Sequence, residues 1–100
     1  MNNNFEGHIQ GDTPVVVDFF AEWCGPCKMM PPILQEVKHA VGDRATILKM
    51  DVDRNAHYAE KYGIQSIPTL IIFKNGRIIW RKSGVASSKE ILAHLAQYIT

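Results

Sequence analysis

The two cysteines of this chain constrain its fold more than any other feature, because they stand two residues apart directly behind a buried strand. The nearly continuous apolar run Val15–Phe20 has the length and the β-branched content of a central strand. The motif Trp23-Cys24-Gly25-Pro26-Cys27-Lys28 follows it, and apolar residues then recur at helical spacing to about Ala40. The chain is therefore expected to place a pair of thiols where a strand passes into a helix.

The remaining pattern predicts one domain that spans residues 1–100. Ala45–Val52 is expected to be a second buried strand, parallel to the first because a helix connects the two. Thr69–Lys74 and Arg77–Arg81 are expected to form a hairpin, because Asn75-Gly76 is typical of a type I′ turn. The predicted fold is therefore α/β, with a four-stranded mixed central sheet.

Helices are expected on both faces of this sheet. Short ones are predicted near 4–10 and over Ala56–Tyr62, and the segment Ser87-Ser88-Lys89-Glu90 has the pattern of a capping box that opens a last helix. In the long helix that follows the cysteines, Pro31 and Pro32 stand about two turns in. They are expected to kink this helix without ending it.

Composition narrows the class of function. The formal net charge is +1 with acidic and basic residues interspersed, which argues against a nucleic-acid or anionic-membrane surface. No apolar stretch approaches the ~18–20 residues that span a bilayer. The first residues lack a basic segment followed by an apolar one, so a cytoplasmic location is expected. In that reducing compartment, a lone close-set cysteine pair is expected to be catalytic or metal-binding.

Thiol–disulfide exchange is the chemistry that this spacing favours. Cys24 is expected to be an exposed nucleophile, because a helix N-terminus lowers the pKa of a thiol and the thiolate is the reactive form. Cys27 stands one turn further on, where it can displace a substrate from Cys24. The alternative is half of a zinc site, for which the chain offers only scattered histidines: His8, His39, His57 and His94. We expect no metal.

Two charged residues interrupt the predicted buried strands. Asp18 lies inside Val15–Phe20, where burial would raise its pKa and let it hold or take a proton near neutral pH. Lys49 interrupts the second strand and could lie close enough to tune Asp18. The alternative is that both side chains merely end strands or reach solvent.

The chain resembles the thioredoxin family from about residue 12 to its C-terminus. The matching segments include the cysteine motif and the following: Val17-Asp18-Phe19, Lys49-Met50-Asp51-Val52-Asp53, Tyr62-Gly63-Ile64, Ile67-Pro68-Thr69-Leu70, Phe73-Lys74-Asn75-Gly76 and Gly84. The resemblance implies a single thioredoxin domain. One departure is that the segment ahead of Pro14 is too short for the family's first edge strand plus a helix. We expect that strand to be missing and Ala45–Val52 to form an exposed edge.

The resemblance also implies roles for individual residues. Cys24 would attack a substrate disulfide, Cys27 would resolve the mixed disulfide, and Asp18 would accept the proton of Cys27. Gly25 and Pro26 would shape the turn between the cysteines. An X-Pro bond is more often trans, but the resemblance favours a cis Pro68 that faces the disulfide. The docking surface for substrates would be a flat apolar patch made of Trp23, Gly25, Pro26, Ile67, Pro68, Gly84 and Val85.

The resemblance predicts a monomeric protein-disulfide reductase that takes part in electron transport and cell redox homeostasis. It would bind no cofactor and take electrons from NADPH through thioredoxin reductase. Its targets would be proteins such as peroxiredoxin, methionine sulfoxide reductase and ribonucleotide reductase. Two rivals remain open at this point: a disulfide oxidant or isomerase, and a non-catalytic interaction subunit with vestigial cysteines.

Overall fold

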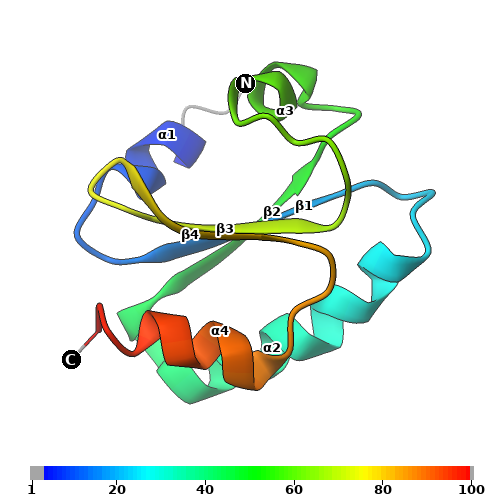
Figure 1. Cartoon of the computed structure of the whole chain (residues 1–100). Helices are drawn as coiled ribbons and strands as arrows, with labels where there is room; N and C mark the ends of the chain where they lie inside the picture. Colours follow the sequence, from blue (N-terminus) through cyan, green and yellow to red (C-terminus); the bar gives the residue numbers. More distant parts are fainter. Residues whose placement is uncertain (1–3, 100) are drawn as a thin grey trace.

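The computed structural model describes residues 4–99, in which a four-stranded sheet lies between two pairs of helices (Figure 1). Helices α1 (Asn4–Ile9) and α3 (Ala56–Lys61) lie on one side of the sheet. Helices α2 (Met30–Val41) and α4 (Ser88–Leu95) lie on the other. The predicted α/β class with helices on both faces is confirmed.

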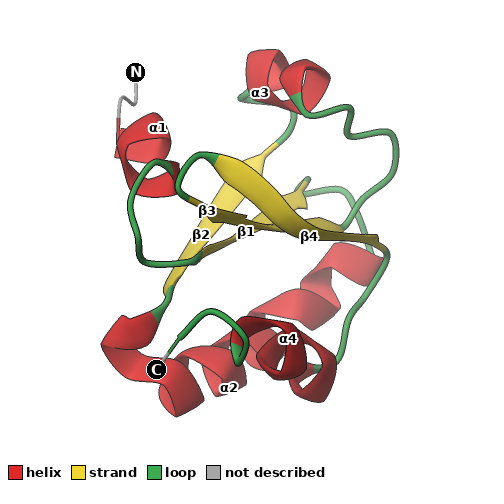
Figure 2. Ribbon diagram, turned by 60° about the vertical axis from the view of Figure 1, so that its left-hand side comes forward, coloured by secondary structure: helices red, strands yellow, loops and turns green. Residues whose placement is uncertain are grey.

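The sheet has the strand order β2-β1-β3-β4, and Figure 2 shows its twist. Strand β1 (Val15–Phe20) pairs in parallel with β2 (Thr46–Asp51) and antiparallel with β3 (Thr69–Lys74), which pairs antiparallel with β4 (Arg77–Ser83). The two central strands, β1 and β3, are buried except at their last residues, as their unbroken apolar runs predict. The sheet is therefore mixed, as expected.

Alternate residues of β1 pack into the two core clusters on opposite sides of the sheet. Val15, Val17 and Phe19 belong to the core cluster that also contains Phe5 of α1. Val16 belongs to the cluster formed with the buried residues of α2 and α4. Because side chains alternate along a strand, Asp18 points to the same face as Val16, beneath α2. This geometry places the one acidic residue of β1 under the helix that follows the cysteines.

The turn between β3 and β4 also holds the end of α1. Asn75 and Gly76 have φ angles of 54° and 77°, which confirms the positive φ values expected for this turn. Their backbone N–H groups donate to the carbonyls of Gly11 (2.8 Å) and Ile9 (2.7 Å). A Cβ at Gly76 would meet Gln10 Oε1 at 2.7 Å, so another residue would have to displace this flexible side chain and also adopt the positive φ.

The helix after the cysteine motif begins differently from the prediction. A 3₁₀ turn, η1 (Pro26–Met29), precedes α2, so Pro31 and Pro32 stand in the first turn of α2 and do not kink it two turns in. Proline has no N–H, so neither residue can donate an α-helical hydrogen bond to the carbonyl four residues earlier. The N–H of Met30 instead donates to the carbonyl of Cys27, three residues back.

Strand β2 forms an edge of the sheet, and β1 is the first strand within residues 4–99. The N–H groups of Thr46 and Val52 donate to the carbonyls of Pro14 and Phe20. The even-numbered residues of β2 thus direct their backbone groups toward β1, and the odd-numbered residues direct theirs away from the sheet. At each end of β2, a side chain donates a hydrogen bond to an outward-facing carbonyl. Lys38 Nζ donates to the carbonyl of Ala45 (3.0 Å), and Asn55 Nδ2 donates to the carbonyl of Asp51 (2.9 Å). The open part of the edge is therefore short, which limits edge-to-edge association.

The expected capping box at the start of α4 forms in part. Ser87 Oγ accepts a hydrogen bond from the N–H of Glu90 at 3.1 Å, as a capping serine should. The Glu90 carboxylate does not reach back to Ser87, because it pairs with Lys82 Nζ of β4 at 2.8 Å. Helix α4 is thus tied to the edge strand by an ion pair.

Candidate active site

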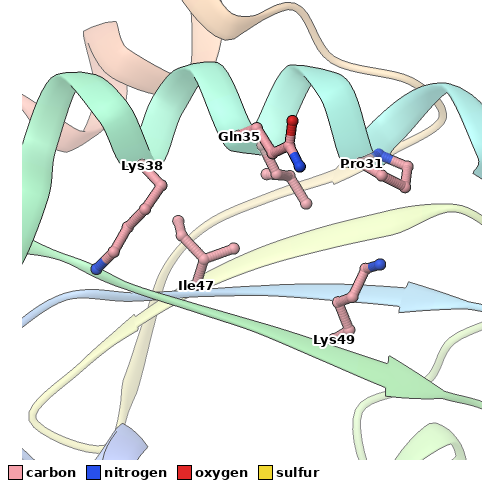
Figure 3. Close-up of a pocket in the computed structure, with 6 residues that line it drawn as sticks. Pro31, Gln35, Lys38, Ile47 and Lys49 are labelled. Atoms are coloured by element: carbon pink, nitrogen blue, oxygen red, sulfur yellow. The ribbon is translucent and has the colours of Figure 1, made fainter.

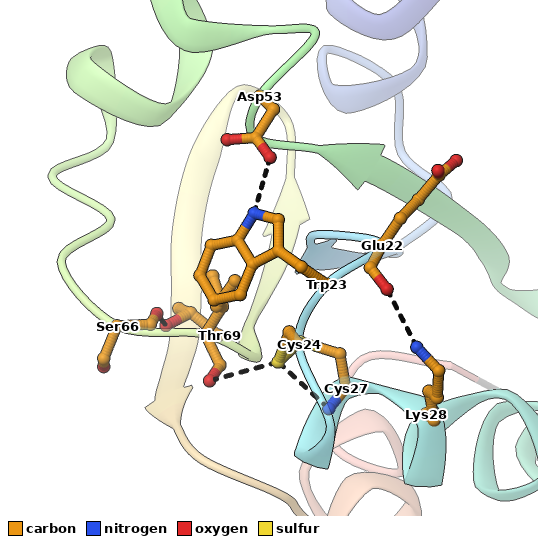
Figure 4. Close-up of a disulfide and its surroundings, with 9 residues drawn as sticks. Glu22, Trp23, Cys24, Cys27, Lys28, Asp53, Ser66 and Thr69 are labelled. Atoms are coloured by element: carbon orange, nitrogen blue, oxygen red, sulfur yellow. Dashed lines mark hydrogen bonds between the residues drawn. A yellow bond between two sulfur atoms is a disulfide. The ribbon is translucent and has the colours of Figure 1, made fainter.

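A disulfide between Cys24 and Cys27 lies just beyond the C-terminal end of β1, where the chain enters η1 (Figure 4). Pro26 is the first residue of η1, the position where a proline's missing N–H is least costly. Gly25 precedes it as the N-cap, and its carbonyl accepts the N–H of Lys28 at 3.0 Å. Gly25 and Pro26 therefore shape the turn that brings the two sulfurs together.

Two polar backbone groups lie close to the Cys24 sulfur. The N–H of Cys27 donates to Cys24 Sγ at 3.2 Å. The carbonyl oxygen of Ile67 lies 3.8 Å from the same sulfur, where it could accept a hydrogen bond from the Cys24 thiol of the reduced form but not from the disulfide. A backbone donor aimed at a sulfur stabilises its thiolate after reduction. The arrangement therefore favours Cys24 over Cys27 as the ionised thiol.

The expected exposure of Cys24 is wrong for the disulfide form. Cys24 is 4% exposed and Cys27 is 5% exposed. Both cysteines pack with Ala21 in a small cluster that Phe20, Val52 and Ile67 help to cover. Ile67, which belongs to the loop between α3 and β3, supplies part of this cover, and local sequence does not reveal that contact.

Asp18 is buried in the central strand, as predicted, and is 1% exposed. Its Oδ1 accepts no hydrogen bond from any residue that the structure describes. Burial raises the pKa of this carboxyl from its ordinary value of 3.8 to about 6, and the charge of Lys49 opposes part of the rise. A carboxyl with this pKa can accept or release a proton near neutral pH.

Lys49 lies next to Asp18 across the β1–β2 pairing, so the predicted proximity is confirmed. No ion pair within 4 Å joins them in residues 4–99. The Lys49 ammonium instead lies 5.8 Å from the centroid of the Phe20 ring. Lys49 and Ile47 line a groove of about 240 Å³ between β2 and α2, with Pro31 and Lys38 on the helix side (Figure 3). The Lys49 side chain is thus exposed to solvent, and its charge lowers the pKa of Asp18 from a distance.

The loop before β3 covers the disulfide. The Ile67-Pro68 peptide bond is cis, which confirms the expectation from the family resemblance. The carbonyl of Pro68 accepts the N–H of Gly84 at 2.7 Å, and Gly84 has a φ of 100° that a residue with a side chain rarely adopts. Ser66 is fixed from the other side, because its carbonyl accepts Thr69 Oγ1–H at 2.6 Å. Ile67 is therefore held against Cys24 by hydrogen bonds on both sides.

The residues expected in an apolar patch divide into exposed and covered ones. Trp23 is 72% exposed, and Gly25 and Pro26 are also exposed. Ile67, Gly84 and Val85 are half-buried, and Val85 also packs against the core beneath α2 and α4. Pro68 is buried, so its ring contributes little to the outer surface.

Asp53 is a residue of this site that the sequence interpretation missed. Its Oδ2 accepts a hydrogen bond from Trp23 Nε1 at 2.7 Å, which fixes the exposed indole beside the disulfide (Figure 4). In the sequence, Asp53 appears only within a segment that resembles the family, with no role of its own. Asp51 does accept the N–H of Asp53 at 2.9 Å, but nothing in the sequence links Asp53 to a tryptophan thirty residues earlier.

No cluster of three or more potential metal-ligating side chains occurs among residues 4–99. None of the helices in the same range has both the length and the apolar character needed to cross a bilayer.

The thioredoxin family model matches residues 1–97. A thioredoxin of Alicyclobacillus acidocaldarius is 47% identical over 96 residues, which cover 96% of this chain and 91% of the relative. A thioredoxin of Rickettsia typhi is 45% identical over 84 residues, which cover 84% and 80%.

Solved structures are similar over most of their length. The thioredoxin of Malassezia sympodialis (Mala s 13) has a TM-score of 0.85 and 37% identity, covering 96% of this chain and 84% of that one. A thioredoxin-2 described as a component of malaria parasite protein secretion machinery has a TM-score of 0.82 and 34% identity, covering 85% and 82%. Sequence and fold therefore point to the same family.

Replacing Asp18 by asparagine is expected to stabilise the oxidised chain above pH 6. Between its ordinary pKa of 3.8 and the folded value of about 6, the folded chain keeps a proton that the unfolded chain has lost. The unfolding free energy of the wild type should therefore fall as the pH rises through this window, by about 3 kcal/mol in total. The neutral amide of Asp18→Asn has no such penalty.

Urea unfolding between pH 4 and 8 measures this difference, with Asp43→Asn at an exposed position as the control. The control should retain the wild-type slope, whereas Asp18→Asn should lose most of it. A slope in Asp18→Asn equal to that of the wild type would show that Asp18 ionises normally in the folded chain.

Proposed function

The chain belongs to the thioredoxin family, and from that premise we propose that it works as a reductant of protein disulfides. Its membership and its Cys24–Cys27 pair make it a thiol–disulfide oxidoreductase. The observation that carries the proposed mechanism is the backbone N–H of Cys27 at 3.2 Å from Cys24 Sγ. This donor stabilises the Cys24 thiolate, which is the form that attacks a disulfide. The reducing direction is supported by membership of the family.

The first step transfers the substrate to Cys24. The Cys24 thiolate attacks one sulfur of the substrate disulfide, the substrate S–S bond breaks, and the departing thiolate takes a proton from solvent. A mixed disulfide then joins Cys24 to the substrate. The exposed Trp23 and the half-buried Ile67 beside Cys24 offer the substrate an apolar surface and a backbone edge along which an extended segment can lie.

The second step releases the product. Cys27 loses its proton, its thiolate attacks Cys24 Sγ, and the second substrate sulfur leaves as a thiolate that is then protonated. Two electrons have passed to the substrate, and the chain holds the Cys24–Cys27 disulfide. We assign the proton of Cys27 to Asp18, because this carboxyl lies on the sheet face beneath α2 and its pKa is about 6. Lys49 keeps that pKa from rising further.

The oxidised chain has to be reduced again before the next cycle. Family membership supports thioredoxin reductase as the donor, with electrons from NADPH and no cofactor held by this chain. Targets would include peroxiredoxin, methionine sulfoxide reductase and ribonucleotide reductase, which present disulfides for reduction. A reducing compartment such as the cytoplasm suits this cycle, in which the monomeric chain would serve electron transport and redox homeostasis.

The direction of the reaction is tested by the redox equilibrium of Cys24–Cys27. The oxidised fraction is measured by thiol alkylation and mass in a series of glutathione buffers. A reductase should have its midpoint below the glutathione poise of the cytosol. A midpoint well above that poise would assign the chain to disulfide oxidation or isomerisation instead.

The order of the two cysteines is tested by trapping. Cys27→Ser should accumulate a mixed disulfide between Cys24 and a substrate protein, because the resolving thiol is gone. The matched variant Cys24→Ser should accumulate none and should lose activity. Equal trapping by both variants would contradict the assignment of Cys24 as the nucleophile. Retained biological function of Cys24→Ser would instead favour a scaffold role.

The role of Asp18 is tested by the pH dependence of turnover. The rate of the second step should rise with pH through about 6 as the carboxyl ionises and becomes able to accept a proton. Asp18→Asn should lose this limb and slow turnover at neutral pH by about a hundredfold, as removal of a general base typically does. A pH–rate profile identical to that of the wild type would remove Asp18 from the mechanism.

A further inference from the structure

The guanidinium of Arg81 joins the edge strand β4 to the end of helix α3. Its Nη2 donates to the carbonyl of Gly63 at 2.7 Å, and its Nη1 donates to the carbonyl of Tyr62. These two carbonyls come from consecutive residues at the C-terminal end of α3, where unpaired carbonyls carry partial negative charge. The planar fork of an arginine suits two neighbouring acceptors, and both hydrogen bonds are charge-assisted.

The tie lies at the start of the loop that covers the disulfide. Gly63 turns the chain out of α3 with a φ of 64°, and the N–H of Ile64 returns to the carbonyl of Ala59 at 2.8 Å. The loop then runs to Ile67, whose carbonyl oxygen lies 3.8 Å from Cys24 Sγ. Its far end is held by the contacts of Ser66 and Pro68 described above. Arg81 is therefore the side chain that fixes the near end.

The same loop forms one wall of a groove beside the disulfide. The groove has a volume of about 260 Å³ and runs between Trp23 and α3, with residues 64–67 along one side. Its position therefore depends on where the loop leaves α3. Arg81 sets that point from β4, where it is paired in register with the fully buried Ile71 of β3. The buried sheet thus determines how the loop and the groove wall are placed.

We propose that Arg81 is a positioning residue for exchange with protein disulfides. It touches neither sulfur; it holds the Gly63–Pro68 loop so that the backbone of Ile67 and the groove wall meet an incoming polypeptide in one fixed arrangement. This inference rests on the proposed function, because a loop of this kind matters most for a substrate that lies along it. A small disulfide that reaches Cys24 alone has no such requirement.

The test compares Arg81→Met with Arg77→Met, which removes the same charge from the same strand. The described residues provide no hydrogen-bond partner for the Arg77 side chain, so this variant controls for charge. The variants are assayed for reduction of insulin and of the small disulfide 5,5′-dithiobis(2-nitrobenzoic acid), with dithiothreitol as electron donor. Arg81→Lys, which keeps the charge but loses the fork, serves as the conservative variant.

Arg81→Met should raise KM for insulin by about tenfold with little change in kcat, because the binding arrangement is lost and the chemistry is not. Its rate with the small disulfide should match that of the wild type. Arg77→Met should resemble the wild type in both assays, and Arg81→Lys should fall between. Equal KM values for Arg81→Met and Arg77→Met, or parallel losses on both substrates, would overturn the proposal.

Hydrogen exchange of the oxidised chain provides a readout that does not depend on activity. The amides of residues 64–67 should exchange faster in Arg81→Met than in Arg77→Met, while amides of β1 and β3 should be unchanged. Unchanged exchange in the loop would overturn the role of Arg81 whatever the kinetics show. A wild-type chain that fails to reduce insulin would refute the reductase proposal separately.

Discussion

The pairing of β1 with strands on both of its sides is the constraint on which the rest of the structure depends. Hydrogen bonds to β2 in parallel and to β3 in antiparallel orientation fix the place where β1 ends. The cysteine motif follows that end directly, so the disulfide inherits its position from the most buried part of the molecule. The loop that covers the disulfide leads into β3, the other central strand. Both sides of the site are thus anchored in one pair of strands.

Asp18 shows what this rigid anchoring allows. An acid in the middle of a central strand is unfavourable, because burial disfavours its charged form and its Oδ1 gains no partner from the described residues. The rest of β1 is apolar and is buried except at Phe20, so the burial of its other residues offsets this cost. The same burial that costs stability raises the pKa of the carboxyl into the range where it can exchange a proton. Stability and the proton transfer proposed for Asp18 therefore make opposite demands on this one residue.

Local patterns predicted most of the fold and the close-set cysteine pair. The apolar run of β1, the Asn75-Gly76 turn and the two cysteines each act through neighbours in sequence, so the expected elements appear with nearly the expected bounds. The proximity of Lys49 to Asp18 followed from the expectation that their two strands are neighbours. What could not be predicted depends on segments that meet only in three dimensions. The bond from Trp23 to Asp53 and the burial of Cys24 beneath Ile67 are of this kind.

The edge strand β4 illustrates why such contacts escape a reading of the sequence. Its residues look like the ordinary mixed surface of a hairpin, with basic side chains on both sides of a short apolar run. In the folded chain, Gly84 just beyond its end binds the carbonyl of Pro68, and Arg81 binds the end of α3. The loop over the disulfide is therefore held at both ends by the strand farthest from β2. The cysteines supply the reactivity, whereas the surface they present to a substrate is set by β4.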